Sequence, residues 1–387
     1  MSISLLVLVL ATVAAFYILV VYPILLASCF RTSKPPVEKN TAFRPTVSIL
    51  VAVHNGERFV KAKLECLLAL RYPRELMEIL VVSDGSTDST DTIVESFSDR
   101  GVRLLRVPRG GKSAALSAAF QEVTGEVVFL TDVRQAIDRD ALAHLAANFA
   151  DPTVGAVTGE LRYCDLDGQG GEADLGIYWR YELWARRRHA EIDSVCNTTG
   201  CIYAIRRGLA GSVPSDTLAD DLFIPLRAHC AGYRVIVDPK AVAYDSLGIE
   251  GGEFRRKVRT LGGLWQVHLR LPALFTRANR MRWHFLSHKS SRLVLPWLIL
   301  TIWTATVALP QSSLRSFLLW DELVLPLFAA IDCFVPKRWA IKRISSPARS
   351  FLALNAASLL SAFVFVVPAR RLWQPTRVKD RQQHRIA

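Results

Sequence analysis

Charged residues are scarce in this sequence of 387 residues: Asp, Glu, Lys and Arg make up 21% of it, whereas 51% is hydrophobic. A disordered chain needs the opposite balance, so the composition excludes disorder and predicts a sizeable buried core. Acidic residues are the scarcer kind, with 35 Asp and Glu against 48 Lys and Arg and a net charge of +13. High basicity together with high hydrophobicity favours a membrane protein with basic cytoplasmic segments over a nucleic-acid-binding protein.

Cysteines are few and irregularly placed. There are seven, an odd number without regular spacing, which excludes a disulfide framework. Cys196 and Cys201 lie close together, but no matching His or Cys pair completes a zinc site. We therefore interpret the cysteines as small buried thiols.

Charge is absent between Ile3 and Phe30, a run of about 28 residues, longer than the ~20 needed to span a bilayer. Leu26–Cys29 resembles a lipoprotein cleavage site, but no basic residue precedes the run and the run is too long for a signal peptide. We expect an uncleaved anchor over residues 1–30 and a basic linker over residues 31–44. The positive-inside rule then places the next domain in the cytoplasm.

A second apolar region covers residues 292–368. Leu293–Leu314 and Ser350–Pro368 are uncharged enough to cross a bilayer, whereas Ser316–Val335 carries three acidic residues that are costly inside a membrane. The segment 337–349 and the tail 369–387 are both basic, and each favours the cytoplasm. The charges therefore predict two or three C-terminal helices and leave the side of the C-terminus open.

Residues 45–250 have a different pattern, in which short apolar runs alternate with amphipathic stretches. This pattern is typical of a parallel sheet flanked by helices, and hence of the α/β class. We expect strands at Val47–Val53, Glu78–Val82, Val102–Val107 and Glu126–Leu130. Helices are expected at Glu57–Leu70 and Ala114–Val123, and a further helix should begin after a cap at Asp88 or Ser89 and continue through Val94. Ligands of open α/β sheets bind beyond the carboxyl ends of the strands. His54, Asn55, Asp84 and Asp132 fall at those ends and predict a site there.

Several of these residues suit particular chemistry. Asp84 and Asp132 each follow an apolar strand, where a carboxylate can bind a base, a ribose or a hard cation, or can simply cap a turn. Lys112 opens a helix after two glycines, which suits a phosphate contact but lacks the full phosphate-loop spacing. Asp220 and Asp221 are adjacent, and a like charge raises one pKa as a general base requires. A solvated helix start is the alternative interpretation of that pair.

A cationic cluster at Arg255–Arg259 can stabilise a leaving diphosphate. The same stretch carries an apolar stripe at helical spacing, formed by Phe254, Val258, Leu261, Trp265 and Leu269. The stripe predicts amphipathic helices at the membrane surface over residues 251–291, and both interpretations can hold together.

The order of these motifs resembles that of the inverting, membrane-bound family 2 glycosyltransferases, which include cellulose, chitin and hyaluronan synthases. The resemblance rests on Val51–Glu57, Val82–Asp88, Gly111–Leu116, Asn197–Arg207, Ala219–Asp221 and Gly232–Val235. It implies a GT-A-like nucleotide-sugar-binding domain over residues 45–250, between N- and C-terminal transmembrane helices. It also implies a multi-pass protein of the cell membrane whose catalytic domain is cytoplasmic.

The resemblance assigns roles to single residues. Asp221 would be the catalytic base, with Asp220 in place of the family's usual Glu. Asp84 would contact the uracil or ribose, and Asp132 would hold Mg²⁺ or Mn²⁺ with the diphosphate. The implied donor-binding residues are Ala52, His54, Asn55, Glu57, Asp84, Lys112, Asp132, Arg256 and Arg259, and the implied acceptor residues are Gly200, Thr260 and Trp265.

Two motifs depart from the family pattern. The usual Asp-x-Asp metal motif is Asp132-Val133-Arg134 here, so one carboxylate remains and dependence on a divalent cation stays open. The Gln-x-x-Arg-Trp motif of processive synthases keeps Arg259 but has Arg256 and Thr260 in place of Gln and Trp. This departure leaves processive and single addition both open.

We expect transfer of a sugar, with inversion, from a nucleotide donor (by resemblance a UDP-sugar) to a membrane-associated polysaccharide or lipid. Three other classes compete with this expectation. A nucleotidyl- or phosphosugar-transferase on the same fold would make less use of Asp221 and the arginine cluster. A catalytically inactive nucleotide-binding scaffold would explain Arg134, and a transporter would need more terminal helices.

Overall fold

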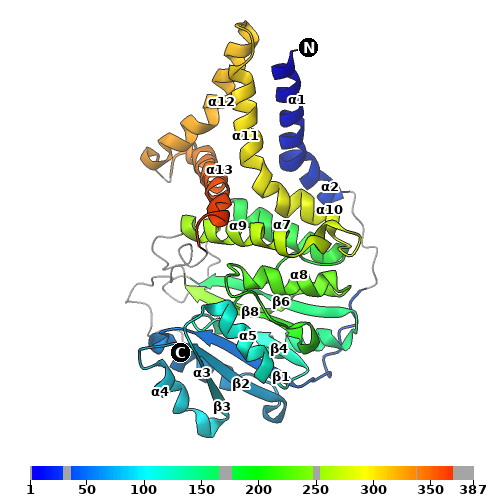
Figure 1. Ribbon diagram of the computed structural model, residues 1–387, viewed down its shortest axis with the longest axis vertical. Helices are drawn as coiled ribbons and strands as arrows, with labels where there is room; N and C mark the ends of the chain where they lie inside the picture. Colours follow the sequence, from blue (N-terminus) through cyan, green and yellow to red (C-terminus); the bar gives the residue numbers. More distant parts are fainter. Residues whose placement is uncertain (1, 29–35, 165–176, 247–252, 337, 369–387) are drawn as a thin grey trace.

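The structure, a computed structural model, describes residues 2–28, 36–164, 177–246, 253–336 and 338–368. A sheet with its covering helices forms one end of the molecule, and apolar helices form the other (Figure 1). Helices α7 (Ile177–Ile192) and α9 (Glu253–Arg270) lie between the two ends. The predicted basic tail 369–387 and residues 31–35 of the predicted linker lie outside the described residues.

The sheet has eight strands in the order β3-β2-β1-β4-β7-β6-β8-β5. They are β1 (Val47–Val53), β2 (Met77–Asp84), β3 (Val102–Val107), β4 (Val127–Leu130), β5 (Ala136–Ile137), β6 (Val154–Cys164), β7 (Tyr203–Arg206) and β8 (Arg234–Ser246). The first four strands in this order are parallel, as predicted, and β1 and β3 have the predicted bounds.

The prediction of a parallel sheet is wrong for the other half. Strand β7 is antiparallel to both β4 and β6, and β5 is antiparallel to β8, while β6 and β8 are parallel to each other. The sheet is therefore mixed. The apolar pattern does not reveal this because a buried strand has the same pattern in either direction.

Helices cover both faces of the sheet and create two apolar cores. They include α3 (Glu57–Leu68), α4 (Thr90–Glu95), α5 (Lys112–Glu122), α6 (Ala141–Ala146) and α8 (Asp220–Cys230). Ile49, Val51 and Val53 of β1 pack with α3, α4 and α6, whereas Leu50 packs with α5 and α8. Successive side chains of a strand point to opposite faces, so a strand buried on both faces is apolar throughout.

Three helices in the described part of the chain are long and apolar enough to cross a membrane. The first, Ile3–Ser28, consists of α1 (Ile3–Phe16), a π-helical turn and α2 (Tyr22–Ser28). The second, Arg282–Val307, consists of α10 (Arg282–His284), a π-helical turn and α11 (Ser291–Val307). The third, Lys342–Phe365, consists of α13 (Lys342–Ser361) and a terminal turn. Their positions agree with the predicted N-terminal anchor and two of the predicted C-terminal spans.

The weaker predicted span corresponds to α12 (Ser313–Ile331), which is not among these three helices. Asp332, directly after it, pairs with Lys342 Nζ at 2.8 Å and with Arg349 at 3.2 Å. Both cations belong to the predicted basic segment 337–349, of which residue 337 lies outside the described residues. Part of that segment is therefore the start of α13, where its charge is offset by Asp332.

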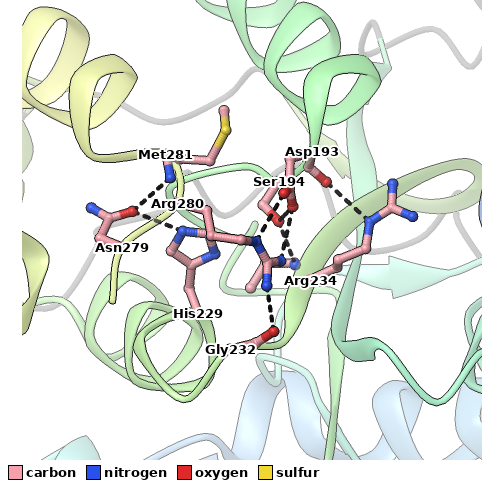
Figure 2. Close-up of polar contacts among 9 residues, drawn as sticks. Asp193, Ser194, His229, Gly232, Arg234, Asn279, Arg280 and Met281 are labelled. Carbon is pink, nitrogen blue, oxygen red and sulfur yellow. Dashed lines mark hydrogen bonds and ion pairs between the residues drawn. The ribbon is translucent and has the colours of Figure 1, made fainter. Parts of the chain in front are cut away.

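A polar cluster joins the second apolar helix to the sheet domain (Figure 2). Arg280, just before α10, pairs with both carboxylate oxygens of Asp193 at 2.9 and 3.1 Å and donates to the Gly232 carbonyl at 2.5 Å. The neighbouring Asn279 Oδ1 accepts a hydrogen bond from His229 Nε2 at 2.8 Å. Because Asp193 follows α7 and His229 belongs to α8, the cluster fixes the helix to two elements of the sheet domain.

Replacing Arg280 by Ala should destabilise this junction, because Asp193, whose side chain is 6% exposed, would lose its cation. We expect the free energy of unfolding to fall by about 2–3 kcal/mol, somewhat less than for a fully buried pair because the arginine is partly exposed. Denaturant unfolding of the detergent-solubilised protein measures the change. Arg277→Ala, at an exposed position of the same loop, is the control, and equal losses in the two variants would contradict the role of Arg280.

Candidate active site

The candidate site lies at the carboxyl ends of β1, β2 and β4, which are neighbours in the parallel half of the sheet. Asp84 is the last residue of β2, and Asp132 follows β4 by two residues. Helix α5 begins at Lys112, and α8 begins at Asp220. The topology therefore brings four charged residues from distant parts of the sequence to one region.

Asp84 holds the turn that leads into α5. Its carboxylate accepts hydrogen bonds from the backbone N–H groups of Gly110 at 2.7 Å and Gly111 at 3.0 Å, and it pairs with the Arg109 guanidinium. A side chain at Gly85 (φ +61°) would lie 2.9 Å from the Arg109 nitrogen, so this close approach requires glycine. Asp84 is 2% exposed, and the structure thus gives it a role in shaping the turn that presents Lys112.

The residues predicted to bind the donor in the loop after β1 contact the loop after β2. His54 Nδ1 hydrogen-bonds to the Asp84 carbonyl at 2.9 Å, and Asn55 Oδ1 accepts from the backbone N–H of Thr87 at 2.8 Å. Glu57 accepts from the backbone N–H of Ser89 at 3.1 Å. These polar side chains tie two strand ends together, while the predicted Ala52 is half-buried within β1.

Lys112 is the central cation of the site. Its Nζ lies 2.9 Å from Asp132 Oδ1 and 3.2 Å from Asp220 Oδ2. Burial alone would lower the pKa of Lys112, but the carboxylates of Asp132 and Asp220 outweigh it and hold that pKa well above its ordinary value. Lys112 therefore remains charged and links the donor-side loop after β4 to the start of α8.

Asp221 has the properties of a general base. Burial, followed by the negative charge of Asp220, raises its pKa to about 6, against the opposing effects of Lys112 and Arg259. A side chain at Gly200 would lie 3.0 Å from Asp221 Oδ2, so this close approach to the carboxylate favours a residue without a side chain. A carboxylate with such a pKa is ionised at neutral pH yet binds a proton more strongly than an ordinary aspartate.

Helix α9 packs directly against the residues that precede Asp221. A side chain at Gly263 would lie 2.6 Å from Ala219 Cβ, and Gln266 accepts from the backbone N–H of Leu218 at 2.9 Å. Arg259, on the same helix, has a buried Nε without a hydrogen-bond partner among the described residues. The segment before Asp221 is thus held by a helix that also contacts the apolar end of the molecule.

The remaining predicted residues of α9 have different surroundings. The ring of Trp265 packs edge-on against Phe365 of the C-terminal apolar region, with 5.6 Å between centroids. Thr260 is exposed, and Arg256 is half-buried. Of the three predicted acceptor residues, the structure brings Gly200 into contact with Asp221 and places Trp265 against the apolar helices.

Two charged residues near the site were not among the predicted site residues. Asp245 in β8 forms a bidentate pair with Arg134 at 2.6 and 2.7 Å, so the arginine that replaces the second metal-motif carboxylate is committed to this partner. Arg186 in α7 donates to the hydroxyls of Thr199 at 2.8 Å and Thr158 at 3.0 Å, beside Gly200. Neither residue belongs to a recognisable motif.

Asp132 decides whether the residues of the site could hold a divalent cation. The described residues contain no group of three or more His, Cys, Asp or Glu side chains that could hold a metal ion. The Asp132 side chain is 38% exposed, and Mg²⁺ is commonly held by one or two carboxylates together with substrate phosphates and water. The residues therefore fit a cation shared between Asp132 and a diphosphate, rather than one held by protein ligands alone.

Known proteins resemble both the sequence and the fold. The family model described as "Glycosyl transferase family 2" matches residues 48–212. A probable glycosyltransferase, YdaM of Bacillus subtilis, is 27% identical over 265 residues, which cover 65% of this chain and 63% of that protein. Poly-beta-1,6-N-acetyl-D-glucosamine synthase of Staphylococcus aureus is 24% identical over 231 residues, which cover 58% and 53%. The chain thus spans between half and two thirds of the length of these curated relatives.

Among solved structures, the mannosyltransferase PcManGT from Pyrobaculum calidifontis, in complex with GDP-Man and Mn²⁺, superposes with a TM-score of 0.69 at 24% identity. The superposition covers 92% of this chain and 96% of that one, and it shows that the two share the GT-A-like fold. The matched residues 48–212 include strands β1 to β7, apart from the first residue of β1, and three residues of the site, Asp84, Lys112 and Asp132. Residues 48–212 of this chain therefore form a glycosyl transferase family 2 domain.

Proposed function

We propose that this protein transfers a sugar from a nucleotide donor to a hydroxyl group of a membrane-associated acceptor, with inversion at the anomeric carbon. The observation that carries the proposal is the placement of Lys112 between Asp132 and Asp220, next to Asp221 with its pKa of about 6. A cation for the diphosphate and a base for the acceptor then lie side by side.

Asp221 would accept the proton of the acceptor hydroxyl. The resulting oxygen attacks the anomeric carbon on the face opposite the diphosphate, the bond from that carbon to the diphosphate oxygen breaks, and the bonding electrons leave with the nucleoside diphosphate. Gly200, which lies against this carboxylate, would mark the acceptor side of the site. One such displacement inverts the configuration of the sugar.

Positive charge from the chain would stabilise the departing diphosphate. Lys112 and Arg259 would take this role, which their electrostatic effect on Asp221 supports. Preorganised charges at the leaving group supply a large part of catalysis in enzymes. Asp132 would hold a divalent cation against the diphosphate, and that cation would add further positive charge. The GDP-Man and Mn²⁺ bound to PcManGT support this assignment. UDP-sugars remain the donors we expect.

We further propose that the protein is a multi-pass protein of the cell membrane with the catalytic domain on the cytoplasmic side. Three helices have the length and composition of membrane spans, and α9 connects this end of the molecule to the base. An acceptor that reaches Asp221 past α9 would lie at the membrane surface. Both a growing polysaccharide and a lipid fit this position, and the synthase relative supports the first.

The pH profile should report Asp221. Because burial and Asp220 raise its pKa to about 6, we expect the transfer rate to fall as pH drops through about 6 and to reach a plateau above 7. Asp220→Asn removes a neighbouring negative charge, so the midpoint should move to lower pH. Steady-state rates at saturating donor between pH 5 and pH 8 measure both profiles. A midpoint that stays in place or rises in this variant would contradict the assignment.

The proposed function is tested by incubating membranes containing the protein with a panel of labelled UDP-sugars and GDP-mannose. Labelled product that extracts into organic solvent identifies a lipid acceptor, and label that remains with polymer identifies a polysaccharide. EDTA should abolish transfer and added Mn²⁺ should restore it, whereas activity that survives EDTA would remove the metal role of Asp132. Nucleotide binding without transfer from any donor would instead favour an inactive scaffold.

A further inference from the structure

Lys63 in α3 is a buried lysine with no role in the mechanism above. It is 3% exposed, and its Nζ donates hydrogen bonds to Thr131 Oγ1 at 2.7 Å and to the Gln135 carbonyl at 2.8 Å. Burial lowers its pKa to about 8, so the side chain is still mainly charged at neutral pH. The two acceptors lie on either side of Asp132 in the sequence, so this ammonium group supports the loop that carries the donor-side carboxylate.

The hydrogen bonds continue from this loop to the acceptor side. Thr131 Oγ1 accepts from Lys63 and donates its own proton to the Cys201 carbonyl at 2.8 Å. Cys201 directly follows Gly200, the residue that approaches the Asp221 carboxylate. One chain of bonds therefore runs from α3 through the donor-side loop to the turn beside the base.

The other end of the loop is held separately. Arg134 pairs with Asp245, and Gln135 Nε2 donates to the same carboxylate at 3.0 Å. This second attachment joins the loop to β8 and does not reach Gly200. Lys112 already joins Asp132 to Asp220, and the link from Lys63 through Thr131 is a second connection, which runs from the donor-side loop to the turn at Gly200.

We propose that Lys63 is a positioning residue that sets the spacing between the donor-side Asp132 and the acceptor-side Gly200. The inference rests on the proposed function. Lys63 touches no reacting atom, so its loss should leave nucleotide binding intact and misalign donor and acceptor. Displacement of about 1 Å can cost roughly 10²-fold in rate. Water is small and needs no such alignment, so hydrolysis of the donor should persist while transfer falls.

The test uses the full-length protein in lipid nanodiscs with the donor that the panel identifies. Thr131→Val removes the hydroxyl at nearly constant volume, Thr131→Ser is the matched control that keeps it, and Lys63→Met removes the ammonium group. Sugar transfer, donor hydrolysis and binding of the nucleoside diphosphate with and without Mn²⁺ are measured for each variant. We expect Thr131→Val and Lys63→Met each to lower transfer by roughly tenfold or more, with hydrolysis and nucleotide affinity within about twofold of wild type.

Thr131→Ser should transfer within about twofold of wild type, and Thr131→Val should cause little further loss in the Lys63→Met background, because both changes break one link. If Lys63→Met does not fold, the Thr131 pair decides. The inference would be overturned if the two Thr131 variants transferred sugar equally well, or if donor hydrolysis fell in parallel with transfer. It would also be overturned if the fold-loss of the double variant equalled the product of the losses of Thr131→Val and Lys63→Met. Wild type and Asp221→Asn are included as references. If the wild type transfers no sugar, the proposed function itself is overturned. If the wild type is active and Thr131→Val transfers sugar equally well, only the role of Lys63 is overturned.

Discussion

Replacing Asp221 by Asn is expected to abolish sugar transfer while nucleotide binding survives. The amide has nearly the same shape but cannot accept the acceptor's proton, and general base catalysis contributes on the order of 10²–10⁴ in rate. We therefore expect kcat to fall about 10³-fold. The local fold should persist, because Thr198 hydrogen-bonds to the backbone carbonyl of residue 221 at 2.8 and 3.1 Å and not to its side chain.

Asp216→Asn provides the control for this variant. Asp216 lies in the loop before α8 and pairs with Arg270 at 2.6 Å, with more than half of its side chain exposed. Its loss should leave kcat within about twofold, since an exposed ion pair contributes little. Calorimetric binding of the nucleoside diphosphate confirms that each variant is folded. Unchanged turnover of Asp221→Asn would remove the base from the mechanism.

Replacing Lys112 by Met should have the second-largest effect, because one change alters both halves of the site. The cation closest to Asp132 and Asp220 is lost, so the diphosphate loses a stabilising charge and the pKa of Asp221 rises further. Removing one preorganised donor to developing negative charge costs about 10²–10³ in rate. We expect kcat/KM to fall by about 10²-fold or more and the acidic limb of the pH profile to move to higher pH.

The shift in pH separates this account from a simple phosphate contact. Lys61→Met, at an exposed position of α3, is the control and should change neither quantity. If Lys112→Met weakened nucleotide binding but left the midpoint of the pH profile in place, Lys112 would bind the donor without influencing the base. The coupling between the two halves of the site would then be wrong.

The parallel half of the sheet could be predicted from the sequence because its strands are buried on both faces. Such strands are continuous apolar runs bounded by turn residues, and β1 and β3 have the predicted bounds. The antiparallel half could not be predicted in this way. Strands β6 and β8 pair with partners far away in the sequence, and their direction depends on contacts that no local pattern encodes.

The candidate site was also predictable in part. Asp84, Lys112, Asp132 and Asp221 belong to motifs, and the strand-end rule placed two of them, Asp84 and Asp132, at the edge of the sheet where the site lies. Lys63 and Asp245 could not be found, since each becomes part of the site only through tertiary contacts. The carboxylate of Asp84 was expected to contact the nucleotide, and its observed partners are the backbone N–H groups and the arginine of the turn before Lys112.

The central claim is a single displacement in which Asp221 activates the acceptor. Its most direct test is the anomeric configuration of the first product formed from a donor of known α configuration. Proton NMR of the purified product gives the coupling between H1 and H2 of the transferred sugar. The account predicts a β linkage, and an α linkage would contradict it.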